Sequence, residues 1–393
     1  MSILKFTPKI EKKNFFKDYK KYIILGIIAI VLITIILFYC FNSSFRNFFT
    51  LYIFRKKVNQ DNLTTISLNE DESSFVYAYD KNIVVLSKNV LSTYNSSGNI
   101  TSENDVNISS PLFSSNNRFL AIAENNGDAI YLISGANIIW QGNVDGKISK
   151  INVNNNGYIS VILIGTSYKS IVVSFDSKGK ELFKTYLSST TAIDMDISND
   201  NKYLSIAEVD SSGAITKSLI KTISIDKAKS DPSNSVIYTY IGENDNLITK
   251  INYCSKNLLA CMYNDSIHYL DIINEQDTEI VSYNNQNNFA DINLKNNCMY
   301  SENKSFGFSS NTDVNITNIP NRNTSFYSLK GSIKSIHCYN EKIAINNGSE
   351  IHFIGLNGWL IKKYSSISEI NTIILGDSIA GIVYKDKVEI IQF

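Results

Sequence analysis

A unit of about 40 residues recurs from residue 62 to residue 393, and this repetition constrains the fold more than any other feature. Each unit holds short runs of Ile, Val, Tyr and Phe between clusters of Asn, Asp, Ser and Gly, as strands joined by turns do. The units begin near residues 75, 109, 148, 191, 248, 291, 332 and 371. Four short strands need about 40 residues, the length of one propeller blade. The sequence therefore predicts an all-β propeller of eight blades; seven is the alternative, because unit 291–331 is the least regular.

Glycine marks one turn of the repeat. Gly98, Gly179 and Gly358 each follow a strand and a short polar segment, and each precedes a second strand. Glycine supplies the positive φ that a tight hairpin requires. These positions predict hairpins between neighbouring strands of a blade.

Two segments depart from the repeat. The step from residue 191 to residue 248 is longer than the others and contains the polar stretch 226–235, which predicts a loop insertion. The last unit, 371–393, has room for only three strands. The apolar segment 63–68 can supply the fourth, which would join the two ends of the ring and remove an exposed sheet edge.

An apolar run precedes the repeats. Tyr22 to Phe41 form 20 residues without a charge. A helix of this length spans about 30 Å, the hydrocarbon thickness of a bilayer. A cleaved signal peptide is the alternative, but its apolar region would be shorter, about 7–15 residues, and would end in small residues. The run ends instead in Phe41-Asn42-Ser43, so we expect an uncleaved, single-pass transmembrane helix.

Basic residues predict the orientation of this helix. Seven lysines precede the run and four Lys or Arg residues follow it closely. Because cytoplasmic flanks carry the excess of positive charge, the N-terminus is expected in the cytoplasm and the large domain outside. The predicted division is a cytoplasmic tail (1–21), a transmembrane helix (22–41), a juxtamembrane stalk (42–61) and an extracytoplasmic propeller (62–393).

The net charge of the outer domain argues against nucleic acid as a partner. Eleven of the 37 bases but only two of the 37 acids lie in residues 1–57, which leaves 26 bases and 35 acids beyond them. Proteins that bind nucleic acid carry a basic face. A domain with a net charge of −9 does not fit that class.

The cysteines and histidines form no recognisable metal site. The five cysteines have no paired motif and are expected to be unpaired and largely in the core, with one disulfide as the alternative: Cys40, Cys254, Cys261, Cys298 and Cys338. His268 and His352 occupy equivalent places in two units, which favours a role in the repeat over two metal ligands. His337 and Cys338 are adjacent, so on a strand their side chains face opposite sides.

Three further motifs are interpreted as turns. Gly376-Asp377-Ser378 resembles the nucleophile block of one hydrolase class, but no histidine follows it. Asn152, Asn154 and Asn156 resemble the start of a calcium loop, yet Leu163 stands where a glutamate is needed. A second calcium-like spacing fails in the same way, with Asn201 at the glycine position and Ala207 at the last position: Asp196, Ser198 and Asp200. The sequence thus predicts no catalytic, cofactor-binding or metal-binding residues.

The repeats resemble those of the quinoprotein-like and WD-type propellers. The arrangement of Lys-rich tail, single span and propeller is similar to a Firmicutes family of membrane-anchored propeller proteins. The resemblance is one of pattern, because neither Trp140 nor Trp359 is followed by Asp. It implies a location at the membrane and a binding role, with no catalytic residues.

These observations favour a non-enzymatic interaction scaffold or sensor in the cell envelope, with a protein of the envelope as its partner. Two alternatives remain open. An envelope enzyme could bring carboxylates together from distant blades, and a receptor could hold a small molecule or glycan in the central funnel. The 23 tyrosines would suit stacking against sugars.

Overall fold

The computed structural model describes residues 15–42, 45–46, 49, 53–54, 57, 63–69, 73–244, 246–283, 288–306, 309–366 and 368–393. The chain divides into two compact units, residues 1–55 and 56–393. The first contains helix α1 (Phe15–Phe41), whose segment Tyr22–Phe41 is long and apolar enough to cross a membrane. A membrane anchor and a signal sequence share these properties.

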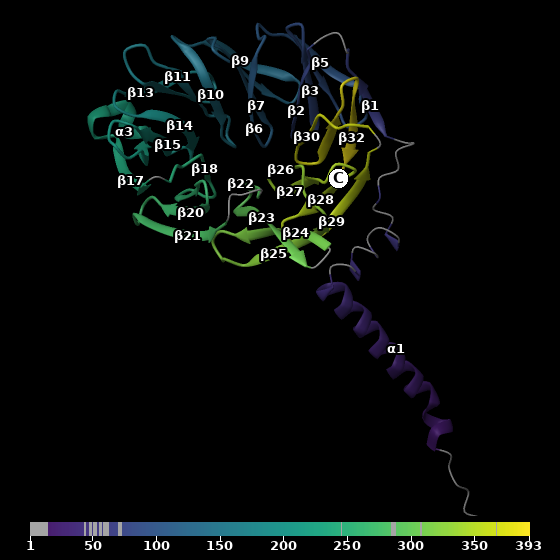
Figure 1. Cartoon of the computed structure of the whole chain (residues 1–393). Helices are drawn as coiled ribbons and strands as arrows, with labels where there is room; N and C mark the ends of the chain where they lie inside the picture. The colour runs from purple at the N-terminus through teal and green to yellow at the C-terminus, as the bar shows by residue number, and fades with distance from the viewer. Residues whose placement is uncertain are drawn as a thin grey trace, which may run out of the picture. The chain divides into compact units, whose positions relative to one another are not determined.

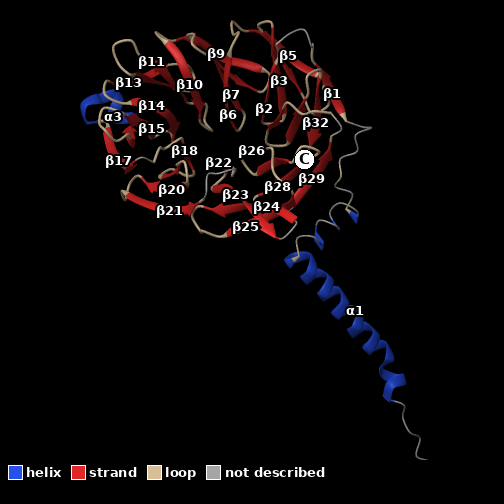
Figure 2. Cartoon of the chain, viewed as in Figure 1, coloured by secondary structure: helices blue, strands red, loops and turns tan. Residues whose placement is uncertain are grey.

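The second unit is a β-propeller of eight four-stranded antiparallel blades around a central axis (Figures 1 and 2), which confirms the predicted fold and blade number. Blades 1 to 4 comprise β2 (Phe75–Tyr79), β3 (Asn82–Ser87), β4 (Val90–Tyr94) and β5 (Ile100–Asp105); β6 (Pro111–Asn116), β7 (Phe119–Glu124), β8 (Ala129–Ser134) and β9 (Asn137–Asn143); β10 (Lys147–Val153), β11 (Ile159–Ile164), β12 (Ser170–Phe175) and β13 (Glu181–Leu187); and β14 (Thr191–Ile197), β15 (Tyr203–Asp210), β16 (Lys217–Ser224) and β17 (Val236–Asn244).

The remaining blades continue this order around the ring. Blades 5 to 8 comprise β18 (Lys250–Tyr253), β19 (Leu258–Met262), β20 (Ser266–Asp271) and β21 (Gln276–Ser282); β22 (Ala290–Leu294), β23 (Asn297–Phe306), β24 (Ser309–Asn318) and β25 (Thr324–Lys330); β26 (Ser335–Tyr339), β27 (Lys342–Asn346), β28 (Glu350–Gly355) and β29 (Leu360–Ser365); and β30 (Thr372–Leu375), β31 (Ile379–Val383), β32 (Lys387–Gln392) and β1 (Thr64–Ser67). The first strand of each blade lies nearest the axis, and each predicted unit begins within a few residues of such a strand.

Blade 8 closes the ring with strands from both ends of the domain. Its strand order is β1-β32-β31-β30, so residues from the start of the domain form the outermost strand. Thr64 pairs with Ile390 and Ser67 with Lys387. The predicted contribution of segment 63–68 to the last blade is confirmed.

The predicted hairpin glycines lie between the third and fourth strands of their blades. Gly98, Gly179 and Gly358 have φ of 73°, 81° and 70°. The side-chain oxygen of Asp176 accepts hydrogen bonds from the N–H groups of Lys178 (2.9 Å) and Lys180 (3.0 Å), which fixes one of these turns.

The insertion in blade 4 is helical, so the prediction of a loop there was wrong. It forms α3 (Ile225–Ser230), which Ser224 caps through the N–H of Lys227, and the 3₁₀ turn η3 (Pro232–Asn234). Ile225 and Ala228 are buried in the core that blades 3 and 4 share. A six-residue helix is too short to show a period in the sequence, and burial of these two side chains supplies its stability.

The core lies between neighbouring blades. One cluster joins Ile162 and Val172 of blade 3 to Met195, Leu204 and Ile206 of blade 4. Each sheet therefore buries apolar side chains against the next, as packed sheets do.

Candidate functional site

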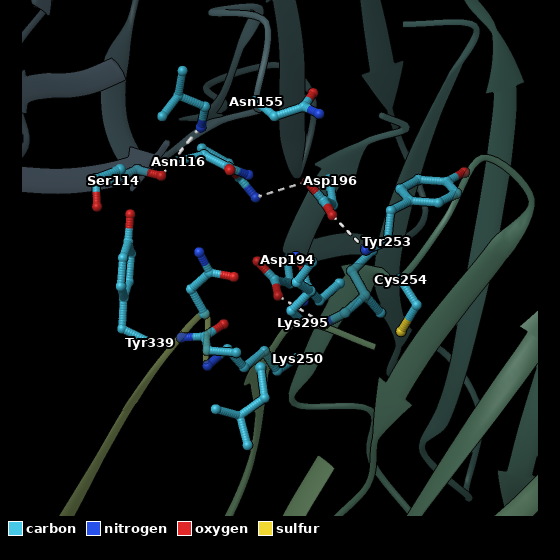
Figure 3. A pocket seen from close by; sticks show the side chains of 18 of the residues that line it. Ser114, Asn116, Asn155, Asp194, Asp196, Lys250, Tyr253, Cys254, Lys295 and Tyr339 are labelled. Carbon is cyan, nitrogen blue, oxygen red and sulfur yellow. Dashed lines mark hydrogen bonds between the residues drawn. The ribbon is translucent and has the colours of Figure 1, made fainter. Parts of the chain in front are cut away.

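A cavity of about 540 Å³ lies on the propeller axis. Most of its wall comes from the innermost strands of seven of the eight blades, β2, β6, β10, β14, β18, β22 and β26, or from the turns that follow them. Thr249, just before β18, and Met262 of β19 also contribute. Figure 3 shows side chains of several blades pointing into this space. This size is typical of sites for small molecules, and the lining is rich in Asn, Asp and Lys.

Two carboxylates of β14 hold the innermost strand of the next blade. Asp194 Oδ2 accepts a hydrogen bond from the N–H of Ile251 (2.8 Å), and Asp196 Oδ2 accepts one from the N–H of Tyr253 (2.6 Å; Figure 3). Both aspartates are buried. The innermost strands have no strand beside them toward the axis, so these carboxylates satisfy backbone groups that would otherwise lack a partner.

Amide and hydroxyl side chains perform the same task at other boundaries. The Nδ2 of Asn152 donates to Met195 O (2.7 Å), and that of Asn252 donates to Ile292 O (3.0 Å). Ser114 Oγ accepts from the N–H of Val153 (3.1 Å). Side chains on β6, β10, β14 and β18 thus link four successive blade boundaries.

The three lysines of the lining are paired with acids. Lys150 Nζ lies 2.7 Å from Asp194 Oδ1, Lys250 Nζ lies 2.7 Å from Asp291 Oδ1, and Lys295 Nζ lies 2.8 Å from Glu341 Oε1. The ammonium groups are therefore neutralised by acids close by. Charge in the cavity is balanced locally.

Asp196 is the one aspartate of the described cavity lining that has no lysine partner. Burial raises the pKa of its carboxyl to about 7, and the negative charge of Asp194 adds to the increase. Hydrogen bonds from the backbone of Tyr253 and Ile197 and from Asn152 oppose it. A carboxyl that titrates near neutral pH therefore lies in the wall of the cavity.

His268 and His352 occupy equivalent positions, each the third residue of the third strand of its blade. His352 Nδ1 lies 2.8 Å from the hydroxyl of Tyr327, on the outermost strand of the preceding blade. His268 Nδ1 lies 3.0 Å from Asp277 Oδ1, and Asp277 also accepts from Tyr240 of the preceding blade (2.7 Å). The histidines link neighbouring blades, which agrees with the interpretation that they belong to the repeat.

The other candidates for metal binding remain separate. Burial lowers the pKa of His337, and Cys338 beside it is half-buried. The four cysteines of the propeller are unpaired, and Cys261 and Cys298 are buried. Among the residues that the structure describes, no group of three or more His, Cys, Asp or Glu side chains could hold a metal ion.

The three calcium-like or hydrolase-like motifs lie in turns or on turn-flanking strands. Gly376-Asp377-Ser378 forms the turn between β30 and β31, where Asp377 accepts a hydrogen bond from Asn340 Nδ2 (2.7 Å). Asn154 Oδ1 accepts from the N–H groups of Asn156 and Tyr158 and fixes the turn after β10. Ser198 Oγ donates to Asp200 Oδ1 in the turn after β14 (2.9 Å).

Sequence reasoning considered a central funnel but named none of the residues that line it, and it missed Asp194 and Lys150. It considered Asp196 only as a calcium ligand. A signal was available, since Asp194 and Asp196 are two residues apart on a strand and so share one face. Locating the axis required knowing that the first strand of each unit is the innermost.

The fold and the axial cavity define the protein as an eight-bladed β-propeller. The chain belongs to the family of unknown function DUF5711, whose model matches residues 54–393. No curated protein matches it.

Solved structures share the fold at low sequence identity. BamB from Moraxella catarrhalis is similar with a TM-score of 0.50 and 12% identity, over 84% of this chain and 96% of that one. The WD40 domain of SCAP from fission yeast gives 0.50 and 10%, over 85% and 99%. The dihydro-heme d1 dehydrogenase NirN gives 0.50 and 7%, over 81% and 70%. Since one of the three is a dehydrogenase, the fold does not by itself separate scaffolds from enzymes.

Proposed function

We propose that this chain is a membrane-anchored, extracytoplasmic propeller that acts as a non-enzymatic protein-interaction scaffold or sensor in the cell envelope. The observation that carries the proposal is a set of exposed apolar side chains at one end of blades 3 and 4. This blade 3–4 patch consists of Ile164, Tyr168, Tyr186, Ile215 and Ile241, which are 41–67% exposed. Exposed apolar side chains gathered on one face are typical of protein-binding surfaces.

The patch lies where the second strand of each blade turns into the third. Ile164 ends β11, Tyr168 lies in the following turn, and its ring centroid lies 4.9 Å from that of Tyr186 on β13, with the rings tilted by 46°. Ile215 lies in the corresponding turn of blade 4, and Ile241 lies near the end of β17. Aromatic and branched side chains on a rigid sheet lose little conformational entropy on binding, which suits them to anchor a partner.

The helix supports the location. Tyr22–Phe41 is long and apolar enough to anchor the propeller, and the excess of lysine before it favours a cytoplasmic N-terminus. The resemblance to Firmicutes anchored propellers is consistent with this arrangement. Tags at the N-terminus and after Phe393 test it: protease added to intact, wall-stripped cells should remove the C-terminal tag and spare the N-terminal one, and the reverse pattern contradicts the orientation.

Site-specific crosslinking tests the interaction. A photoreactive amino acid at position 186 or 241 of the full chain, in intact cells, should give a discrete adduct with an envelope protein. The matched controls are positions 139 and 326, where Ile139 and Phe326 are 44% and 53% exposed on other blades. Equal adducts from all four positions, or none from 186 and 241, contradict a docking role for the patch.

A further inference from the structure

We propose that the axial cavity is a binding site for a neutral, hydroxyl-rich ligand of sugar size. This inference goes beyond the scaffold function and does not rest on it, because the blade 3–4 patch contributes no residue to the cavity wall. It rests on four features of the cavity: unengaged carboxamides, balanced charge, closed strand edges and an aromatic wall.

The first feature is a group of carboxamides that bind nothing within the protein. Asn116, Asn155, Asn199 and Asn296 line the cavity, and no described residue forms a hydrogen bond with their side chains. Asn155 Oδ1 is also shielded from solvent. They come from the turns after the first strands of four blades, or from the end of that strand (Figure 3 labels Asn116 and Asn155). A carboxamide both donates and accepts, as a ligand hydroxyl does, and a buried acceptor without a partner is costly.

The second feature is the balance of charge. Lys150, Lys250 and Lys295 each have a carboxylate within 2.8 Å. An anionic ligand would compete with these carboxylates, and a cationic one would compete with the ammonium groups. Asp196 has no lysine partner, but both of its carboxyl oxygens already accept hydrogen bonds from backbone N–H groups. A neutral ligand can enter without breaking an ion pair, so the wall favours an uncharged molecule.

The third feature is that backbone groups on the axial side of β18 and β22 are already engaged. Asp194, Asp196 and Asn252 bond to backbone groups of the strand in the next blade. A peptide that adds to a sheet as a further strand needs free N–H and C=O groups along the edge. The cavity is therefore suited to a compact ligand that side chains recognise.

The fourth feature is the apolar part of the wall. The rings of Tyr77 and Phe113 stack at 5.0 Å with an interplanar angle of 17°, and both line the cavity together with Tyr339. All three rings are half-buried. A sugar presents C–H groups on one face and hydroxyls at its rim, so it matches a wall that combines aromatic rings with carboxamides.

Saturation-transfer NMR tests the site on the full chain in phospholipid nanodiscs, which carry no sugar. The probes are glucose, galactose, mannose, N-acetylglucosamine and maltose, with glucose 6-phosphate and glucuronate as charged counterparts. We expect transfer to at least one neutral sugar and weaker transfer to the charged ones. Transfer to none of the neutral sugars, or to the charged ones only, overturns the proposal.

A pair of variants locates the binding. Asn155→Ala combined with Asn296→Ala should weaken the affinity for the neutral sugar about tenfold, since two hydrogen bonds are lost. Asn107→Ala is the matched control, because Asn107 is exposed and lies outside the cavity. An unchanged melting temperature of the double variant shows that its fold is intact. Equal affinity in the double variant and the control overturns the assignment to the cavity.

Discussion

The closing blade and the boundary between blades 4 and 5 hold the ring together with different groups. In blade 8, β1 pairs with β32 through a backbone ladder that joins residues 64–67 to residues 387–390. Between blades 4 and 5, the buried carboxylates of Asp194 and Asp196 bind single N–H groups of β18. A ladder depends little on side-chain identity, whereas a carboxylate contact depends on ionisation. The closure should therefore respond to chain length, and the blade 4–5 boundary to pH.

The largest effect is expected from breaking the ladder. Deletion of residues 386–393 removes β32, leaves β1 and β31 with unpaired edges and exposes the cluster around Ile66. We expect no cooperative unfolding transition in circular dichroism of the full chain.

A matched pair of substitutions on β1 checks that the loss of stability comes from the loss of packing and pairing by this strand. Ile66→Asp buries a charge in the cluster and should cost more than about 4 kcal/mol, while Ser67→Asp, exposed and opposite Lys387, should cost less than about 0.5 kcal/mol. If the chain that lacks residues 386–393 melts within a few degrees of the parent chain, the ring is not closed by pairing of β1 with β32.

The second effect concerns the boundary between blades 4 and 5, where Asp194 and Asp196 bind β18. The pKa of Asp196 rises from 3.8 to about 7 on folding. Between pH 3.8 and about pH 7, the carboxyl group is therefore protonated in the folded state and ionised in the unfolded state. Its contribution to stability is complete below pH 3.8 and is lost as the pH rises through about 7, a change of about 4 kcal/mol. Asp196→Asn should remove this dependence.

Denaturant unfolding at several pH values from 4 to 8 measures the effect as the difference between parent and variant. Burial lowers the pKa of His337 and His352, which gives the opposite slope, but both chains share that contribution. Parallel stability curves for the two chains would show that Asp196 does not titrate in this range.

A smaller effect is expected at the boundary between blades 6 and 7. Tyr327→Phe removes the hydroxyl that lies 2.8 Å from Nδ1 of the buried His352. Loss of this hydrogen bond should lower the free energy of unfolding by about 1–2 kcal/mol. Tyr186→Phe is the control, since Tyr186 is 52% exposed, and equal stability of the two variants would contradict a structural role for the histidine contact.

The smallest effect compares two blades at matching places. In blade 4, Ser205 Oγ lies 2.8 Å from Thr222 Oγ1 and 2.7 Å from the hydroxyl of Tyr253. In blade 3, Ser160 on β11 lies opposite Ser174 on β12. Both hydroxyls are buried, and neither has a hydrogen-bond partner among the described residues. Replacing both with Ala should change stability by less than about 0.5 kcal/mol or increase it, whereas Ser205→Ala should cost about 1 kcal/mol. Thermal melts that rank the variants in the reverse order would contradict this comparison.

The sequence alone determined the architecture, because local signals define it. The recurring strand-and-turn unit predicted eight blades, positive φ at Gly98, Gly179 and Gly358 required glycine, and the three-strand remainder at 371–393 required segment 63–68. The apolar run at Tyr22–Phe41 also followed from composition alone.

Only the tertiary structure decided what the polar side chains do. No local pattern of the sequence shows that Asn155 of blade 3 and the pair Asp194 and Asp196 of blade 4 meet at one axis; closing the ring brings them there. Ile225 and Ala228 form a helix because blade 4 buries them. Such properties depend on burial and on contacts between residues 40 or more positions apart, such as Asp194 and Ile251. Local period and propensity carry no information about which of these distant groups meet.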